Sequence, residues 1–255
     1  MNAEYGARPH AHGTRFLLRS TADAAWLCLF DGGGDAERRL PMAREGSDFA
    51  IDVGGVGPGA RYGYRTGHDP AKLLVDPYAV ELDRRFAHDD RLAVPGVDTA
   101  ALVPRAIVQP ARAVVQPDAP LFRPGGLIYE VNVRGFTMRH PDVPPAIRGT
   151  VAALAHPAVI AHLRRMRVAA VELMPVVAAI DERHLPPLGL SNAWGYNPVV
   201  PMALDPRRCP GGVAELRSAV AALHDAGIGV LLDLVFNHSG ESDAHGGTLS
   251  FRGLD

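Results

Sequence analysis

The chain has 255 residues, of which 47% are hydrophobic and 21% charged, a balance typical of a globular protein of one or two domains. A formal net charge of −2 argues against a nucleic-acid-binding protein, and a single lysine, Lys72, excludes a phosphate-binding P-loop. The 2 cysteines, the polar N-terminus and the lack of a long apolar run predict no disulfide framework, no membrane span and a cytoplasmic location.

The N-terminal part carries short β-like segments separated by glycine and proline turns. After a tail of about 12 residues that is expected to fray, the apolar or alternating runs are residues 15–19, 25–30, 49–53 and 60–65. The last run alternates, so Tyr62 and Tyr64 are expected on one face, opposite the flanking Arg61 and Arg65. The pattern predicts a β-sandwich over residues 1–102.

Residues 103–126 contain five prolines and are predicted to form an extended linker. Beyond the linker, three apolar runs are predicted strands, and two helical stripes separate them. The predicted elements, in order, are a strand at 127–133, a helix at 159–166, a strand at 168–174, a helix at 213–223 and a strand at 229–236. This order predicts parallel strands with right-handed crossovers. The segment 176–210 is predicted to be a long functional loop.

The third predicted strand ends in a cluster of polar residues. From Val230 to Phe236 every residue is apolar except Asp233, so the strand is expected to be buried on both faces. Asn237 and His238 follow directly. The carboxyl end of such a strand is where α/β folds place their chemistry, so these residues are candidates for a functional site.

Several ordered motifs resemble a known family. The segment Asp233 to His238 (DLVFNH) looks like the first signature region of the α-amylase superfamily, glycoside hydrolase family 13, and 171–176 (VELMPV) is similar to its second-strand signature. The segments 128–137, 188–198 and 248–255 narrow the resemblance to glycogen debranching enzymes of the isoamylase type. The strands before residue 102 resemble the carbohydrate-binding module that precedes such barrels.

The resemblance implies a multi-domain chain. An immunoglobulin-like, carbohydrate-binding-module-like sandwich (1–102) and the linker (103–126) would precede the first β-α-β-α-β part of an incomplete (β/α)8 TIM barrel (127–255). The implied activity is hydrolysis of α-1,6-glucosidic branch linkages in glycogen and branched maltodextrins. It retains anomeric configuration and uses two carboxyl groups about 5 Å apart. In the family these groups follow later strands, so we expect the nucleophile and acid/base beyond Asp255, and this chain inactive alone.

The resemblance also assigns binding residues. Tyr196 matches a tyrosine that stacks on the sugar at the cleavage subsite, and His238 a histidine that hydrogen-bonds that sugar; the structural alternatives are a core aromatic and a strand-end cap. Asp233 matches a carboxylate of the active-site network, with an Arg on the fourth strand as its expected partner. Asn237 matches a position that helps hold calcium in many members. Apart from this possible calcium, no cofactor is implied.

Other polar and aromatic residues leave alternatives open. Residues 181–184 (Asp-Glu-Arg-His) are expected to be a solvated loop, and Glu130 is expected to be structural. Trp26, with Tyr62 and Tyr64, could form a glucan platform or lie in the core. Three barrel strands would leave an open edge that favours self-association. Two further functions stay open: a non-catalytic α-glucan-binding module, and another superfamily enzyme such as a trehalose-releasing hydrolase.

Overall fold

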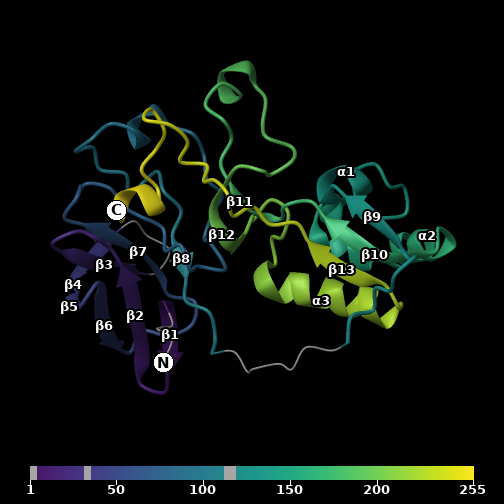
Figure 1. Ribbon diagram of the computed structural model, residues 1–255, viewed down its shortest axis with the longest axis horizontal. Coiled ribbons are helices and arrows are strands. Elements are labelled where there is room, and N and C mark those ends of the chain that lie inside the picture. The colour runs from purple at the N-terminus through teal and green to yellow at the C-terminus, as the bar shows by residue number, and fades with distance from the viewer. Residues whose placement is uncertain (1–4, 32–35, 112–118) are drawn as a thin grey trace.

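The computed structural model describes residues 5–31, 36–111 and 119–255. Figure 1 shows an antiparallel β region at one end of the molecule and an α/β region at the other, with a small two-stranded sheet between them. Among the described residues no helix is long and apolar enough to cross a lipid bilayer.

Two four-stranded sheets form the N-terminal region, in the orders β1-β2-β6-β5 and β4-β3-β7-β8. The strands are β1 (Gly6–His10), β2 (Gly13–Arg19), β3 (Ala25–Phe30), β4 (Glu37–Pro41), β5 (Ala43–Glu45), β6 (Asp48–Gly54), β7 (Arg61–Thr66) and β8 (Ala106–Ile107). All their pairings are antiparallel. Alternation explains the layering, because β2 buries Phe16 and Leu18 while Arg15 and Arg19 face solvent.

One prediction for this region is wrong, and the burial of one residue was not predicted. The expected frayed tail contains β1, which pairs with β2 from Gly6 to His10. Alternation places Arg65 and Tyr64 on opposite faces of β7, and both side chains are buried. The reason is that residues 70–71 and 98 cover the outer face of β7. Arg65 donates to two backbone carbonyls at 70 and 71 and pairs with Glu37 at 2.6 Å.

The predicted linker is partly integrated into the N-terminal sheets. Within it, β8 pairs with β7, and Val108 donates its backbone N–H to the carbonyl of Ala60. Residues 112–118 of the predicted linker lie outside the described residues. Residues 106–107 of this segment therefore form the edge strand of a sheet and are not a free linker.

The α/β region contains a parallel sheet in the order β13-β10-β9. Its elements are β9 (Leu127–Val131), α1 (Val133–Thr137), α2 (Pro157–Arg165), β10 (Val168–Leu173), α3 (Gly212–Asp225) and β13 (Gly229–Leu232). Apolar residues of α2, α3 and the strands form a second core, separate from that of the N-terminal sheets. The predicted strand–helix order and the parallel pairing are confirmed.

The expectation that residues 230–236 form a strand buried on both faces is wrong. The strand β13 ends at Leu232, and the side chains of Leu231 and Leu232 are 39% and 43% exposed. Phe236 is 71% exposed. The reason is position: β13 is an edge strand, so β10 flanks it on one side and no described strand flanks it on the other.

The predicted long loop contains regular structure. Residues of β11 (Val177–Ala179) pair antiparallel with β12 (Pro198–Leu204), and between them lies a short 3₁₀ turn, η4 (Pro186–Leu188). Buried residues of this sheet, such as Val199 and Ala203, pack into the core of the N-terminal region. The sheet therefore joins the two regions.

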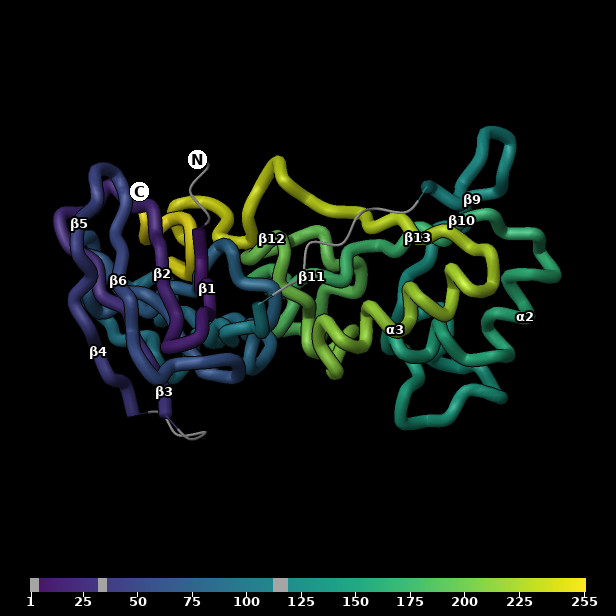
Figure 2. Tube along the Cα trace, turned by 90° about the horizontal axis from the view of Figure 1, so that it is seen from below, coloured from purple at the N-terminus to yellow at the C-terminus, as the bar shows by residue number. Residues whose placement is uncertain are grey.

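The C-terminal segment returns to the N-terminal sheets. Figure 2 shows the yellow C-terminal residues beside the purple strands. The carbonyl of Leu254 accepts the backbone N–H of Thr21 at 3.0 Å, and that of Leu249 accepts Val75 N–H at 2.8 Å. Leu249 and Leu254 are both buried in that core.

Candidate functional site

Three residues assigned to sugar binding meet at the carboxyl edge of the parallel sheet. The Tyr196 hydroxyl donates to Asp233 Oδ2 at 2.5 Å, and His238 Nε2 donates to the backbone carbonyl of Tyr196 at 2.8 Å. These contacts join positions 37 and 42 residues apart in sequence. We call Tyr196, Asp233 and His238 the Tyr196 cluster.

The sheet positions the carboxylate of this cluster. Asp233 follows β13 directly, and its backbone N–H donates to the carbonyl of Leu173 at the end of β10. The side chain is thereby fixed at the strand end although the regular strand has stopped. An Arg was expected as its partner, but in the described residues the partner is the Tyr196 phenol.

Electrostatics favour the protonated phenol. The hydrogen bond to Asp233, with a smaller contribution from burial, raises the pKa of Tyr196 to about 12. The phenol therefore keeps its proton near neutral pH and donates it in a hydrogen bond to the Asp233 carboxylate. The exposed ring of His238 contacts this loop through Nε2 and the Tyr196 carbonyl, and its Nδ1 lies 3.2 Å from Asn237 Oδ1.

The backbone turn before Tyr196 depends on two residues of the motif. Asn192 Oδ1 accepts the backbone N–H groups of Trp194 and Gly195 at 2.9 and 2.7 Å. Gly195 has φ +88, and a Cβ there would lie 2.8 Å from the carbonyl oxygen of Pro175. Glycine is therefore required both by conformation and by close approach.

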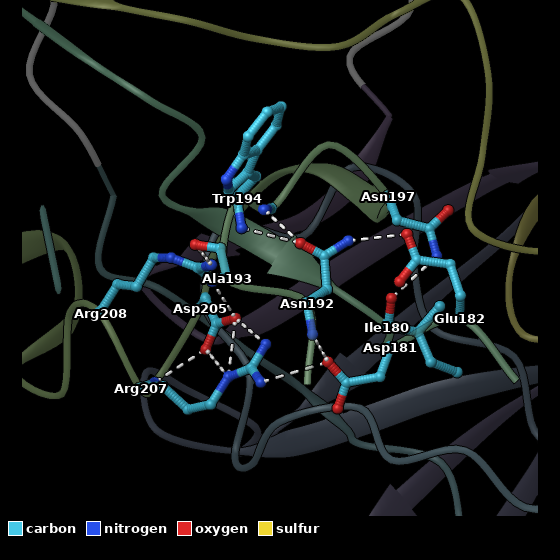
Figure 3. A network of polar contacts seen from close by, with 11 residues as sticks. Ile180, Asp181, Glu182, Asn192, Ala193, Trp194, Asn197, Asp205, Arg207 and Arg208 are labelled. Atoms are coloured by element: carbon cyan, nitrogen blue, oxygen red, sulfur yellow. Dashed lines mark hydrogen bonds and ion pairs between the residues drawn. The ribbon is translucent and has the colours of Figure 1, made fainter. Parts of the chain in front are cut away.

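A network of ion pairs anchors this loop, as Figure 3 shows. Asp205 is 1% exposed and accepts from Arg207 and from Arg208, at 2.8 and 2.9 Å. Arg208 also reaches the carbonyl of Ala193 at 3.4 Å. The loop is thus tied to the segment after β12, which is itself packed in the core.

The expectation of a solvated loop at residues 181–184 is wrong for its first two members. Asp181 Oδ1 accepts the backbone N–H of Asn192 at 2.8 Å and lies 3.7 Å from Arg207 Nη1. Glu182 Oε1 accepts from the Asn192 amide at 2.8 Å. Both carboxylates are half-buried because they hold the base of the loop that carries Tyr196.

Sequence reasoning missed an exposed aromatic beside the cluster. Trp194 is 66% exposed, and its ring meets that of Tyr196 edge-on at 6.4 Å between centroids. The two rings line a hollow with Glu130, Asn132, Met174 and Ala193. Trp194 lies in the same motif as Tyr196, which was the available signal; Glu130, expected to be structural, forms part of the wall.

The geometry around Asn237 does not support the predicted calcium site. The side-chain oxygen of Asn237 faces His238, and the described residues contain no group of three or more His, Cys, Asp or Glu placed to hold a metal ion. Calcium requires six to eight oxygen ligands. The residues present do not fit such a site.

The glucan platform proposed for the N-terminal region is not assembled. Tyr62 and Tyr64 are 2% and 0% exposed and lie in the core, with their rings 5.8 Å apart. Trp26 is half-buried. The tyrosines therefore stabilise the sandwich and leave no shared aromatic surface with Trp26.

The fold is the one seen in solved pullulanases. The pullulanase of Anoxybacillus sp. LM18-11 complexed with maltotetraose aligns with a TM-score of 0.73 at 24% identity, over 98% of this chain and 37% of that chain. The type I pullulanase of Bacillus subtilis str. 168 complexed with maltose aligns at 0.70 and 22%, over 94% and 34%. At this identity the likeness establishes the fold alone.

The sequence is similar to glycogen debranching enzymes, as its motifs indicated. The glycogen debranching enzyme of Yersinia pseudotuberculosis serotype IB (strain PB1/+) is 45% identical over 274 residues, which cover 98% of this chain and 41% of the relative. That of Yersinia enterocolitica serotype O:8 is 45% identical over 275 residues, with the same coverage. The chain spans about two fifths of the length of these curated relatives. A comparison with protein-family models finds no match.

Proposed function

We propose that these residues form the substrate-binding side of an α-glucan hydrolase that cleaves α-1,6 branch linkages in glycogen and branched maltodextrins. One observation carries the proposal: an aromatic ring, a carboxylate and an imidazole meet in the Tyr196 cluster, in a chain 45% identical to glycogen debranching enzymes. Such a set suits a sugar better than a charged ligand.

Each member of the cluster has a proposed role. The apolar C–H face of a pyranose packs on the Tyr196 ring, which Asp233 holds in place through the phenol. His238 donates through Nε2 to the Tyr196 carbonyl, so a sugar hydroxyl would donate to Nδ1 of this exposed ring, in place of its contact with Asn237. Trp194, exposed on the same wall, extends the aromatic surface towards a neighbouring sugar.

The proposal includes an architecture. Residues 1–102 form an immunoglobulin-like module of the carbohydrate-binding-module type, 103–126 connect it, and β9, β10 and β13 within 127–255 are the first strands of a (β/α)8 barrel. The two reacting carboxyl groups belong to further strands. The exposed apolar edge of β13 is then a contact surface, either for those strands or for a second copy.

A chimeric enzyme tests the proposal. The 255-residue chain replaces the matching segment of the Yersinia pseudotuberculosis relative, and release of linear maltooligosaccharides from a branched limit dextrin is measured. We expect activity that falls at least about 100-fold with Tyr196→Ala, because stacking and the Asp233 contact are lost together. Tyr78→Ala, at an exposed tyrosine of the N-terminal region, is the matched control.

Two outcomes would contradict it. A chimera that melts cooperatively and binds the dextrin but releases nothing would favour the non-catalytic glucan-binding alternative. Equal activity in the Tyr196→Ala variant and the parent chimera would remove the Tyr196 cluster from the site.

A further inference from the structure

A buried carboxylate outside the Tyr196 cluster organises the chain segment that follows the cluster. Glu241 is 3% exposed, and its carboxylate accepts three backbone N–H groups. Oε1 accepts those of Leu249 and Ser250 at 2.7 and 2.8 Å, and Oε2 accepts that of Arg252 at 3.0 Å. We call residues 241–252 the clasp. Hydrogen bonds to an ionised group are about twice as strong as neutral ones, so this carboxylate fixes the backbone at the far end of the clasp.

The side chain of Arg252 closes the clasp from the opposite end. Its guanidinium donates to the backbone carbonyls of Glu241 and Ser242, at 3.0 and 2.8 Å, and to that of Gly246 at 3.3 Å. Glycine is needed at 246, because a Cβ there would overlap the carbonyl oxygen of Glu241. Each end of the clasp is therefore held by a side chain from the other end.

The clasp begins three residues after His238, and the backbone between them lies against the segment that carries Tyr196. The N–H of Gly240 donates to the carbonyl of Pro198, the first residue of β12, at 2.6 Å. The ring of His238 is exposed, and its Nε2 contacts the Tyr196 carbonyl at 2.8 Å. The direction of its Nδ1 therefore depends on where the backbone from His238 to Glu241 is held.

The other end of the clasp is anchored in the N-terminal sheets. Ser250 Oγ donates to the carbonyl of Val75 at 2.9 Å, and the carbonyl of Gly253 accepts from Thr66 Oγ1 at 2.7 Å. Ser250 and Thr66 are 0% and 1% exposed, so these bonds lie inside the protein. The clasp thus connects the backbone beside His238 with the core of the N-terminal region.

We propose that Glu241 is a positioning residue, which holds the ring of His238 on the Tyr196 carbonyl by fixing the clasp to the N-terminal sheets. The use of that ring to bind a sugar rests on the proposed function, whereas its placement by Glu241 does not. The N-terminal region then contributes to the site as the anchor of the clasp. Precise placement matters, because a shift of about 1 Å in a binding group is enough to weaken its action strongly.

NMR spectra of the 255-residue chain test the placement without any sugar. A His238→Ala spectrum assigns the ring signals of His238. We expect Glu241→Ala to move these signals towards those of a histidine in an unfolded peptide, because all three backbone contacts of the carboxylate are lost. Glu241→Gln should move them less, since the glutamine oxygen still accepts from Leu249 and Ser250 and only the contact with Arg252 is lost.

The matched control is a second glutamate of the α/β region that binds backbone N–H groups. Glu215 accepts those of Ala152 and Gly211 at 2.8 and 2.6 Å. Glu215→Gln therefore removes a contact of the same kind at a place outside the clasp. It should leave the His238 signals unchanged.

Activity of the chimeric enzyme separates positioning from a general loss of stability. We expect Glu241→Ala to lower kcat/KM on a branched limit dextrin about tenfold, and His238→Ala to lower it at least as much. The double variant should be within about twofold of His238→Ala, because a residue that acts through another has no effect once the other is removed. Glu241→Gln should recover part of the loss.

The outcomes separate the inference from the proposed function. Unchanged His238 signals in Glu241→Ala, or losses in kcat/KM that multiply in the double variant, would overturn the positioning role. Shifted signals with an inactive chimera, or with full activity of His238→Ala, would support the placement by Glu241 and contradict the proposed function. Thermal melts show whether each variant keeps its fold. If Glu241→Ala unfolds, Glu241→Gln serves for both measurements.

Discussion

The two sheet regions of this molecule differ in what covers their strands. In the N-terminal region two sheets share one core, and Phe16, Leu18 and Leu27 are 0% exposed. In the parallel sheet of the α/β region, Leu127, Leu231 and Leu232 are between 39% and 46% exposed. Apolar runs were predicted to be strands in both regions. The comparison teaches that an apolar strand is buried only where a second layer or a neighbouring strand is present.

The largest expected effect tests this contrast directly. Phe16→Ala removes a fully buried ring that packs edge-on against Tyr62 at 5.0 Å, so we expect a loss of about 3–5 kcal/mol in the free energy of unfolding. Leu232→Ala, at the exposed edge of β13, should cost less than about 1 kcal/mol. Urea unfolding of both variants measures the difference. Similar losses would mean that β13 is covered in solution, as it would be in a self-associated form.

A pH effect is expected next, and it belongs to the N-terminal region alone. Burial raises the pKa of Asp76 from its ordinary value of 3.8 to about 6, although Tyr62 and the backbone of Tyr78 donate to it. The folded state therefore binds this proton more tightly than the unfolded state. Asp76 costs no stability below about pH 4, and its cost grows as the pH rises to about 6 and then stays constant.

Comparison with an Asp76→Asn variant isolates this contribution. The stability of the variant relative to the parent should increase between pH 4 and pH 6, by about 3 kcal/mol at most, because one pKa unit corresponds to about 1.4 kcal/mol. Unfolding free energies at several pH values give the difference. A difference that is constant over this range would show that Asp76 titrates in the folded protein as it does in the unfolded chain.

The smallest expected effect lies in the α/β region, at the loop that carries the Tyr196 cluster. Gly195→Ala adds a Cβ 2.8 Å from the Pro175 carbonyl at φ +88, so we expect a loss of about 1–3 kcal/mol and weaker maltotriose binding. Gly189→Ala is the matched control, because it has φ +68 with nothing within 4 Å of the new Cβ. It should cost only about 1 kcal/mol and leave sugar binding unchanged. Equal behaviour of the two variants would show that the close approach at Gly195 is relieved by movement of the loop.

Much of the fold could be predicted, because local pattern suffices where a strand has neighbours on both sides. The run 25–30 was predicted and matches β3, an inner strand. The sheet β11–β12 could not be predicted in this way, since three-residue β11 gives too short a pattern. Its pairing is decided by the core of the other region, into which Ala178 and Val200 pack.

For the candidate site, sequence motifs identified the aromatic and polar residues but not all their partners. Tyr196 and His238 were predicted to act together, and they are in contact. The bond from Tyr196 to Asp233, and the role of Asp181 at the base of the loop, were not predicted. Such contacts join residues distant in sequence, and a pattern of residue types carries no information on which of several acceptors lies within reach.

The sequence by itself determined the order of strands and helices around the parallel sheet and the likeness to glycogen debranching enzymes, since each depends on residue type and spacing. The tertiary structure alone decided that β13 is an exposed edge, that Arg65 is buried, and that the clasp held by Glu241 is anchored in the N-terminal sheets. The physical reason is that burial and close contact depend on the segments that fold over a residue, and these segments come from distant parts of the chain.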